Sequence, residues 1–344
     1  MSQVNIRREG RAGRMTLTRP EALNALSHEM SLQIEAALRS WAEDPEVALV
    51  VLDAEGDKAF CAGGDIREMY DTGRAGDYAY GRTFWRDEYR MNALMAEYPK
   101  PVVSFLNGFV MGGGVGVGCH ASHRVVGESA RIAMPECGIG LVPDVGGSLL
   151  LARAPGRLGA YLGLTGARMG PGDAIHAGFA DHYLPEAGWE AAKAALCETG
   201  TTAPLLKAAR PAPVSRLAEN QDYIDALFAS GTLPGIRAAL SEESGDDIAD
   251  RALKALETGC PLSMAATLEL LERLHGEEDI RKALSLEFRF TARAMEHGDF
   301  IEGIRAQIID RDRKPRWRHG LDVTPETVSA MLAPLEQDLT FDAP

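Results

Sequence analysis

The sequence predicts an α/β fold with mostly parallel strands, followed by a region built from helices. Up to about residue 184, short apolar runs alternate with segments whose apolar residues recur at helical spacing. The apolar runs are hydrophobic at consecutive positions, which is typical of strands covered on both faces in a parallel sheet. Beyond residue 184 the pattern is helical as far as residue 312, apart from a Pro-rich stretch at residues 210–217.

The individual elements follow from local patterns along the chain. Residues 4–20 predict two short strands around a Gly turn, and residues 28–44 form an amphipathic helical run. Residues 66–97 are also expected to be helical, and they are rich in aromatic and charged side chains. The aromatic residues between Tyr78 and Tyr89 are either core or a cover over a site. Buried strands are expected at residues 47–56, 101–108, 123–127 and 179–184.

The change of pattern sets the predicted domain boundary. We expect a catalytic core at residues 1–190 and a helical C-terminal region at residues 191–344 that packs on it. No internal repeat is detectable in the sequence.

Composition excludes several classes of protein. The 344 residues contain 36 Lys and Arg against 50 Asp and Glu, for a net charge of −14. This balance argues against a nucleic-acid or anionic-membrane partner. The uncharged run at residues 101–119 contains six glycines, a proline and an asparagine, which disfavours a membrane-spanning helix.

The cysteines and the N-terminus predict the compartment. Five cysteines without a CxxC pair indicate free thiols in a reducing environment. The N-terminal segment is basic but lacks the apolar stretch of a secretory signal, so we expect a cytoplasmic protein.

Several catalytic motifs are absent from the sequence. It has no GxSxG elbow, Walker A loop, HExxH or CxxC motif. His120 and His123 are three residues apart, which is weak evidence for a metal, and a structural role at a strand edge is favoured. We therefore expect no metal site.

Two glycine-rich turns each follow an apolar segment. The first is Ala62-Gly63-Gly64-Asp65, in which Asp65 is placed to cap the next helix, and the second is the run that ends in Gly112-Gly113-Gly114. Each turn is able to aim a backbone N–H group at one carbonyl oxygen, as an oxyanion hole requires. The alternative is a pair of ordinary strand-to-helix turns.

Two carboxylates stand out in the next segment. Glu136 and Asp144 each follow a proline within an apolar, Gly-rich stretch at residues 133–147. Carboxyl groups in such surroundings tend to have perturbed pKa values, as general acids and bases do. Either residue is equally well interpreted as a helix cap.

Together, the three segments resemble the crotonase (enoyl-CoA hydratase/isomerase) superfamily over roughly residues 3–190. The resemblance implies a ββα-superhelix core that binds a coenzyme A thioester, with the N–H groups of Gly64 and Gly113 forming the oxyanion hole. It also implies that Ala62, Gly63 and Asp65 belong to the stretch that lines the substrate's nucleotide pocket. Coenzyme A would then be part of the substrate, and no separate cofactor is expected.

Departures from the hydratase pattern narrow the implied activity. The position of one hydratase glutamate is Gly116 here, whereas the other is retained as Glu136. Asp144 stands where hydratases usually have Gly. The strings FWRDEY, MGGGVG and HGDFIEGIRAQIIDRDRKPRW are similar to the branch of the superfamily that hydrolyses short 3-hydroxyacyl-CoA thioesters. That likeness extends over nearly the whole chain and implies that Glu88, Gly113, Glu136 and Asp144 contact the substrate.

The resemblance implies a role for each carboxylate. Glu136 is the expected general base, or the nucleophile through a transient anhydride. Asp144 is assigned to the substrate's 3-hydroxyl group or to the attacking water, and Glu88 to orienting them. The implied acyl group is 3-hydroxyisobutyryl, in valine catabolism, or 3-hydroxypropionyl, which lacks one methyl group.

Two alternatives to the hydrolase activity remain, and the oligomeric state is open. The alternatives are an enoyl-CoA hydratase or isomerase and a non-catalytic acyl-CoA-binding member of the superfamily. Crotonases commonly assemble through their C-terminal helices, which implies a homo-oligomer; the alternative is that the longer C-terminal region here folds back on its own subunit.

Overall fold

The computed structural model describes residues 3–341 and divides into two compact units. The first unit consists of Met1–Asp65, Arg90–Ala133 and Arg168–Glu219, and the second of Ile66–Tyr89, Met134–Ala167 and Asn220–Pro344. The boundaries of the compact units therefore differ from the predicted division at residue 190. Residues 191–219 belong to the first unit, whereas two segments from the predicted core belong to the second.

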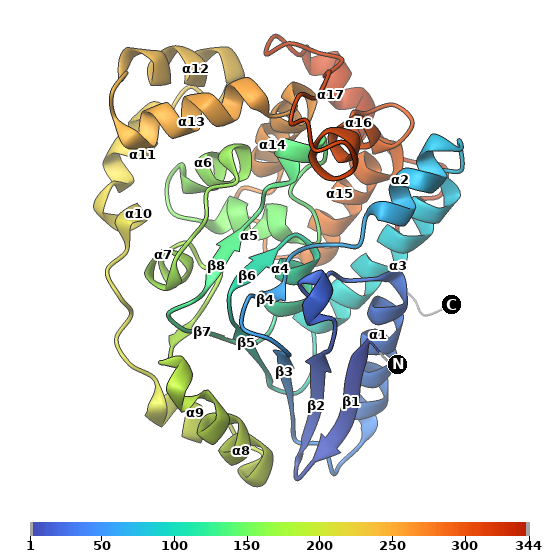
Figure 1. The fold of residues 1–344 in the computed structure, drawn as a ribbon, viewed down its shortest axis with the longest axis vertical. Helices are drawn as coiled ribbons and strands as arrows, with labels where there is room; N and C mark the ends of the chain where they lie inside the picture. Colours follow the sequence, from blue (N-terminus) through green and yellow to red (C-terminus); the bar gives the residue numbers. More distant parts are fainter. Residues whose placement is uncertain (1–2, 342–344) are drawn as a thin grey trace. The chain divides into compact units, whose positions relative to one another are not determined.

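The first unit contains a six-stranded sheet in the order β1-β2-β3-β5-β7-β9 (Figure 1). The first two strands pair antiparallel and all the others pair parallel. All of these strands lie within segments that the sequence predicts as strands. They are β1 (Val4–Glu9), β2 (Ala12–Leu17), β3 (Leu49–Ala54), β5 (Val102–Leu106), β7 (His123–Val126) and β9 (His182–Tyr183).

A second sheet of three short parallel strands was not predicted. Its strands are β4 (Ala59–Cys61), β6 (Phe109–Met111) and β8 (Arg131–Ala133), in the order β4-β6-β8. Each has only three residues, too few for a periodic pattern to distinguish it from a turn. Successive strands thus alternate between the sheets, β3 and β4, then β5 and β6, then β7 and β8. This alternation is a structural repeat, although the sequence shows none.

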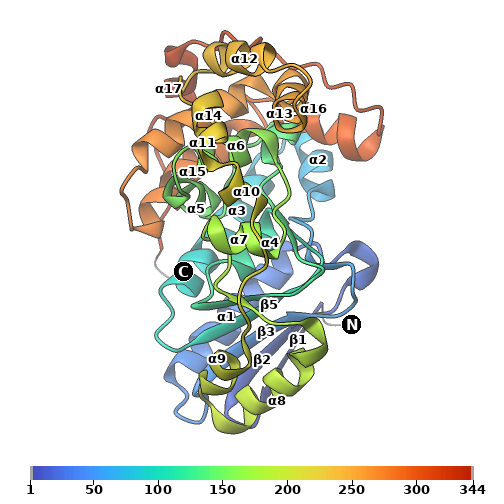
Figure 2. The same ribbon diagram turned by 90° about the vertical axis from the view of Figure 1, so that its left-hand side faces the viewer.

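Helices of the first unit pack on its larger sheet. Trp189 and Leu196 of α8 join β-strand residues such as Val51 and Phe105 in one apolar cluster. Helix α8 lies beside β2 (Figure 2). Lys193 on the same helix pairs with the buried Asp53 of β3 at 2.9 Å. The helical elements assigned wholly to this unit are η1 (Pro20–Ala22), α1 (His28–Glu43), α4 (Gly113–Gly118), α7 (Pro171–His176), η3 (Glu186–Gly188), α8 (Trp189–Thr199), α9 (Ala203–Ala208) and α10 (Arg216–Glu219).

The second unit is built from helices. The predicted helical stretch at residues 66–97 forms two helices separated by a turn at Gly76, whose φ is +80°. These are α2 (Arg67–Arg74) and α3 (Ala79–Ala96), of which α3 continues into the first unit at Arg90. The other helical elements are η2 (Glu136–Ile139), α5 (Gly147–Arg153), α6 (Leu158–Thr165), α11 (Gln221–Leu227), α12 (Leu233–Glu242), α13 (Asp247–Thr258), α14 (Pro261–Arg273), α15 (Ile280–Ala294), α16 (Phe300–Ile304), the π-helical η4 (Arg305–Ile309) and α17 (Pro325–Leu332).

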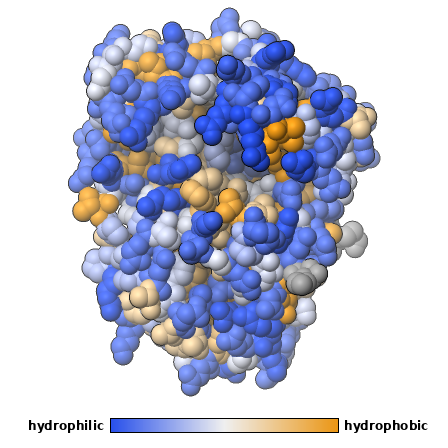
Figure 3. All heavy atoms as spheres, viewed as in Figure 1, coloured by the Kyte–Doolittle hydropathy of each residue, from blue (hydrophilic) through white to orange (hydrophobic). Residues whose placement is uncertain are grey.

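The surface and the helices are relevant to the expectation that residues 101–119 do not form a membrane-spanning helix. Figure 3 shows hydrophilic side chains over most of one face, with apolar side chains scattered among them. Among the described residues, none of the helices combines the length and the apolar character needed to span a membrane.

The close approach of α4 to β4 gives a test of the first unit's packing. A Cβ atom on Gly114 would lie 2.1 Å from the carbonyl oxygen of Cys61, so one backbone would have to move. Gly114→Ala should therefore lower the free energy of unfolding by about 3 kcal/mol, the upper part of the range for overpacked cores, because the contact is with backbone. Chemical denaturation of the purified variant measures the change.

Gly170→Ala is the matched control, because a Cβ atom there meets nothing within 4 Å. Its effect should stay below ~1 kcal/mol. Equal losses in the two variants would show that the contact with Cys61 is not a packing constraint.

Candidate active site

The two glycine turns follow neighbouring strands of the small sheet. β4 ends at Cys61 and β6 ends at Met111, and the two strands pair in parallel, with Cys61 opposite Val110. Because parallel strands end at the same edge of a sheet, the turns that follow them lie close together. The structure thus brings both predicted oxyanion turns to one edge of the small sheet.

Hydrogen bonding leaves the predicted donor of the first turn available. The N–H groups of Ala62 and Asp65 donate to the carbonyl oxygens of Leu23 and Leu26, at 3.1 and 2.8 Å. The N–H group of Gly64 has no acceptor among residues 3–341. A polar N–H group left in this state is available to a ligand oxygen.

The second turn leaves a donor for a different reason. Gly113 is the first residue of α4, so its N–H group has no partner within the helix. The preceding Gly112 has φ +47° and ψ −120°, a conformation that strongly favours glycine. A glycine is therefore required where the chain turns into α4.

Asp65 does not cap the next helix, contrary to the sequence-based expectation. The residue at the N-cap of α2 is Ile66, and no side chain caps this helix. Asp65 instead forms an ion pair of 2.9 Å with Arg19, which also donates to the carbonyl oxygen of Ala25 at 2.7 Å. The predicted binding residues Ala62, Gly63 and Asp65 thus belong to a turn that is bonded to residues 19–26.

Three predicted carboxylates gather in the second unit. Glu88 lies on α3, Glu136 begins η2, and Asp144 lies in the connection between η2 and α5. Their exposed fractions are 3%, 5% and 4%. Within residues 3–341, Glu88 Oε1 and Glu136 Oε2 are buried and have no hydrogen-bond partner. Buried acceptors left unbonded are costly, so these two oxygens are the atoms that a water molecule or substrate hydroxyl would satisfy.

Neither Glu136 nor Asp144 is a helix cap, the alternative that the sequence left open. Pro135 occupies the N-cap of η2 and Gly146 that of α5, and no side chain accepts a capping bond at either position. Neither carboxyl group is therefore used to cap a helix.

Burial raises the pKa of all of these carboxyl groups, and the charge of Asp144 adds to the rise in Glu88 and Glu136. Burial, followed by the charge of Asp144, raises the pKa of Glu88 and that of Glu136 well above their ordinary values. Burial raises the pKa of Asp144 to about 7, against the opposing effect of a hydrogen bond from Tyr89. Asp144 is thus the shared electrostatic neighbour of the cluster. Acids with pKa values near neutral can exchange protons during a reaction at that pH.

Two members of the cluster were not singled out from the sequence. The Tyr89 hydroxyl donates to Asp144 Oδ2 at 2.6 Å, so this aromatic residue is both core and part of the site. Glu287 of α15 is fully buried, and the charge of Asp144 contributes to its raised pKa of about 8, whose main cause is burial. A signal existed, because Glu287 interrupts the apolar face of α15 that contains Ala283, Leu284 and Phe290 at helical spacing.

No metal site is evident in the part of the chain that the structure describes. Within residues 3–341, no group of three or more His, Cys, Asp or Glu side chains is arranged to hold an ion. The predicted absence of a metal or separate cofactor remains a prediction. His123 instead stacks on His182, with ring centroids 5.7 Å apart, at paired strands β7 and β9.

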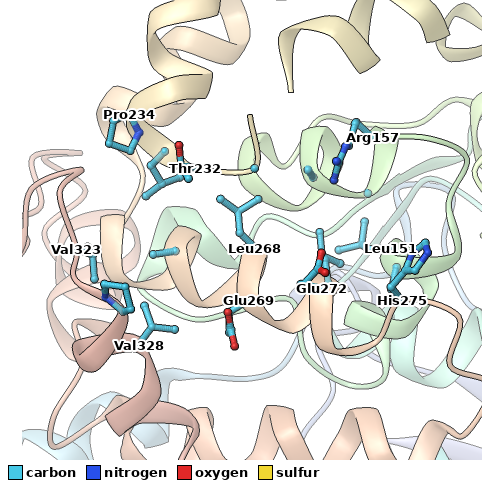
Figure 4. Close-up of a pocket in the computed structure, with 18 of the residues that line it drawn as sticks. Leu151, Arg157, Thr232, Pro234, Leu268, Glu269, Glu272, His275, Val323 and Val328 are labelled. Atoms are coloured by element: carbon cyan, nitrogen blue, oxygen red, sulfur yellow. The ribbon is translucent and has the colours of Figure 1, made fainter. Parts of the chain in front are cut away.

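Two cavities open within the second unit. One, of about 470 Å³, has Leu268 and Glu269 of α14 on its wall, with Arg157 and His275 toward one end, and it contains none of the predicted site residues (Figure 4). The other, of about 330 Å³, is lined by residues that include Pro135 and Cys137. The residues on both sides of Glu136 in the sequence therefore line a cavity.

Comparison with known proteins identifies the family. A family model described as enoyl-CoA hydratase/isomerase matches residues 12–332. This chain therefore belongs to the enoyl-CoA hydratase/isomerase family, and the resemblance and the crotonase fold inferred from sequence are confirmed.

Three similar proteins carry different descriptions. The mitochondrial 3-hydroxyisobutyryl-CoA hydrolase of Xenopus laevis is 39% identical over 321 residues, which are 90% of this chain and 82% of the relative. A crystal structure described as an enoyl-CoA hydratase from Rhodobacter sphaeroides 2.4.1 is 60% identical, with a TM-score of 0.95, and the match covers 99% of this chain and 100% of that one. A carnitinyl-CoA dehydratase structure from Mycobacterium thermoresistibile is 40% identical, with a TM-score of 0.95 and full coverage of both chains.

The raised pKa of Asp144 predicts how stability depends on pH. The folded protein holds this proton to about pH 7, whereas a free Asp side chain loses it near pH 4. The folded state therefore binds more protons in that interval, and the free energy of unfolding contributed by Asp144 falls as the pH rises through it. In Asp144→Asn, which keeps an oxygen for the Tyr89 hydroxyl, this contribution should disappear.

Thermal unfolding measures the effect. Relative to wild type, Asp144→Asn should gain a few degrees in Tm between about pH 5 and about pH 8. A Tm difference that stays constant with pH would mean that Asp144 has an ordinary pKa in the folded protein.

Proposed function

We propose that this protein hydrolyses a short 3-hydroxyacyl-CoA thioester, with 3-hydroxyisobutyryl-CoA as the first substrate to test. The observation that carries the proposal is the buried cluster of Glu88, Glu136 and Asp144, in which two carboxyl oxygens lack a partner among the described residues. Such a cluster suits both a substrate hydroxyl and an attacking water molecule. The names of similar proteins, including the Xenopus relative, support the same substrate.

The proposed reaction needs a group of donors for the thioester oxygen and a base or nucleophile. In the first unit, the N–H groups of Gly64 and Gly113 would donate to the thioester oxygen and stabilise the negative charge that develops there. In the second unit, Glu136 would accept a proton from water or attack the carbonyl carbon itself. The C–S bond then breaks, the acyl carbon gains a hydroxyl group derived from water, and the coenzyme A sulfur leaves as a thiolate that takes up a proton.

The remaining carboxyl groups give the proposed site its preference for a hydroxylated acyl chain. Asp144 is assigned to the 3-hydroxyl group or the attacking water, and Glu88 to orienting it. A buried site that hydrogen-bonds a hydroxyl group rejects chains that lack it, because its polar atoms would stay unpaired. 3-Hydroxypropionyl-CoA also has this hydroxyl group and differs by one methyl group, so it is the second substrate to test.

Enoyl-CoA hydration is the second candidate, because the Rhodobacter structure with 60% identity is described as a hydratase. The composition of α4 weighs against it. This helix has the sequence GGVGVG and carries no carboxyl group, with Gly116 at the position where the hydratase pattern has a glutamate. A hydratase built on this chain would need Glu88 or Asp144 to replace that acid.

The other predictions about cellular context stay open. The proposal needs no metal or cofactor besides the coenzyme A of the substrate. A cytoplasmic location and a homo-oligomer remain predictions from the sequence, and the Xenopus relative is a mitochondrial protein. Valine catabolism is the pathway implied by the proposed substrate.

A substrate assay tests the proposed reaction directly. Free thiol should be released from 3-hydroxyisobutyryl-CoA, whereas crotonyl-CoA, a hydration substrate, should lose no enoyl absorbance. Hydration without thiol release would support the hydratase instead. Binding of acyl-CoA with neither reaction would indicate a non-catalytic member of the family.

Substitution of Glu136 tests the assignment of the base or nucleophile. Glu136→Gln keeps the side-chain shape but removes the carboxylate, so kcat should fall by about 10²- to 10⁴-fold with little change in coenzyme A binding. Asp53→Asn, which alters a buried carboxylate on β3, is the matched control and should keep kcat near that of wild type. Full activity in Glu136→Gln would remove Glu136 from the chemistry.

A further inference from the structure

The turn that carries Asp144 has a strained backbone. Val145, the next residue, has φ +54°, in the left-handed region that β-branched residues rarely adopt. The carbonyl oxygen of Asp144 accepts a hydrogen bond of 2.6 Å from the N–H group of Gly147, which closes the turn. A conformation of this kind persists only where surrounding contacts hold it.

Glu287 supplies those contacts from α15. Its Oε2 accepts a hydrogen bond of 2.8 Å from the N–H group of Gly146, and its Oε1 accepts one of 3.2 Å from that of Ser148. The Ser148 hydroxyl also donates to Oε1. The carboxyl group therefore bonds the two residues that flank Gly147, the first residue of α5.

Burying the Glu287 carboxyl group is costly in either protonation state unless hydrogen bonds replace its hydration. The side chain is fully buried, and it has no ion-pair partner among residues 3–341. An unpaired buried carboxyl group is unfavourable, so its hydrogen bonds must offset the loss of hydration. All of these bonds go to Gly146 and Ser148. The mechanism proposed above uses Asp144 but gives Glu287 no contact with the substrate.

The same helix also supports the carboxylate of Asp144. Thr291, one turn beyond Glu287, has its Oγ1 3.4 Å from the Tyr89 hydroxyl, which donates to Asp144. Phe288 packs edge-on against the Tyr89 ring, with centroids 6.2 Å apart. Helix α15 thus supports Asp144 in two ways. Glu287 bonds the backbone that follows Asp144, and Thr291 and Phe288 contact Tyr89, which donates to the Asp144 side chain. Figure 2 shows α15 beside α5.

We propose that Glu287 is a positioning residue that holds the strained turn and thereby aims the Asp144 carboxylate at the substrate. The catalytic part of this inference rests on the proposed function, because it requires Asp144 to bind the acyl hydroxyl group or the attacking water. The structural part, that Glu287 fixes the turn, stands on the hydrogen bonds alone.

The test compares three variants. Glu287→Ala removes every bond to the turn, Glu287→Gln keeps one acceptor oxygen, and Ser148→Ala removes only the hydroxyl contact. Asp53→Asn again controls for the loss of a buried carboxylate. For each purified protein, kcat and KM are measured together with amide hydrogen exchange in residues 142–149.

A displaced catalytic group lowers the rate more than it weakens binding. Glu287→Ala should lower kcat by about 10- to 100-fold with KM within about twofold of wild type. Exchange in residues 142–149 should become faster. Glu287→Gln should recover most of the rate, and Ser148→Ala should cause a smaller loss of about two- to fivefold. If Glu287→Ala does not fold, the other two variants carry the same comparison.

Three outcomes would overturn the inference. Unchanged exchange in Glu287→Ala would mean that the turn holds without Glu287. A kcat like that of Asp53→Asn, with exchange accelerated, would mean that the turn does not aim a catalytic group. A loss of rate in Glu287→Gln as large as in Glu287→Ala, with exchange in residues 142–149 like that of wild type, would make Glu287 a proton-transfer group. If wild type releases no thiol, the proposed function fails and with it the aiming of Asp144, while the exchange measurement still decides whether Glu287 holds the turn.

Discussion

The burial of several carboxyl groups around Asp144 is the constraint on which the second unit's chemistry depends. Burial favours the protonated forms, and each ionised neighbour makes the next ionisation harder, so the pKa values of Glu88, Glu136, Asp144 and Glu287 all rise. The hydrogen bonding of these carboxyl groups differs, however. Glu287 is fully bonded to backbone and to Ser148, whereas Glu88 and Glu136 each keep a buried oxygen without a partner in the described part of the chain. The bonded member contacts the turn that follows Asp144, and the unbonded oxygens are those that the proposed function assigns to water or substrate.

In the first unit, the predicted donors for the thioester oxygen are backbone N–H groups and not side chains. Two short parallel strands end together, and each is followed by a glycine turn. At the first turn, residues 19–26 bind the N–H groups on either side of the Gly63-Gly64 pair, and at the second the start of α4 leaves Gly113 without a helical partner. Gly114 lets α4 approach Cys61 more closely than any side chain allows. The proposed oxyanion site, made from backbone N–H groups, would need no charged residue.

Sequence reasoning found the residues with local signals and missed those whose importance is non-local. The prolines before Glu136 and Asp144 and the glycines around Gly64 and Gly113 are visible in short motifs. Strands β4, β6 and β8 have three residues each, so they become recognisable only when paired. Asp65 has the sequence position of a helix cap, but Arg19 lies within 2.9 Å and takes the carboxylate instead. Tyr89 fits a core position equally well, and only its contact with Asp144 reveals a polar role.

The sequence by itself determined the family, the α/β class, the larger sheet's strands and the pair of glycine turns, because each depends on residue type and spacing over a few neighbouring positions. Only the tertiary structure decided that the carboxyl group of Glu287, 143 residues beyond Asp144 in the chain, bonds the turn that Asp144 begins. It also decided which carboxyl oxygens remain unbonded. Hydrogen-bond partners and burial depend on which distant segments pack together, and no local pattern contains that information.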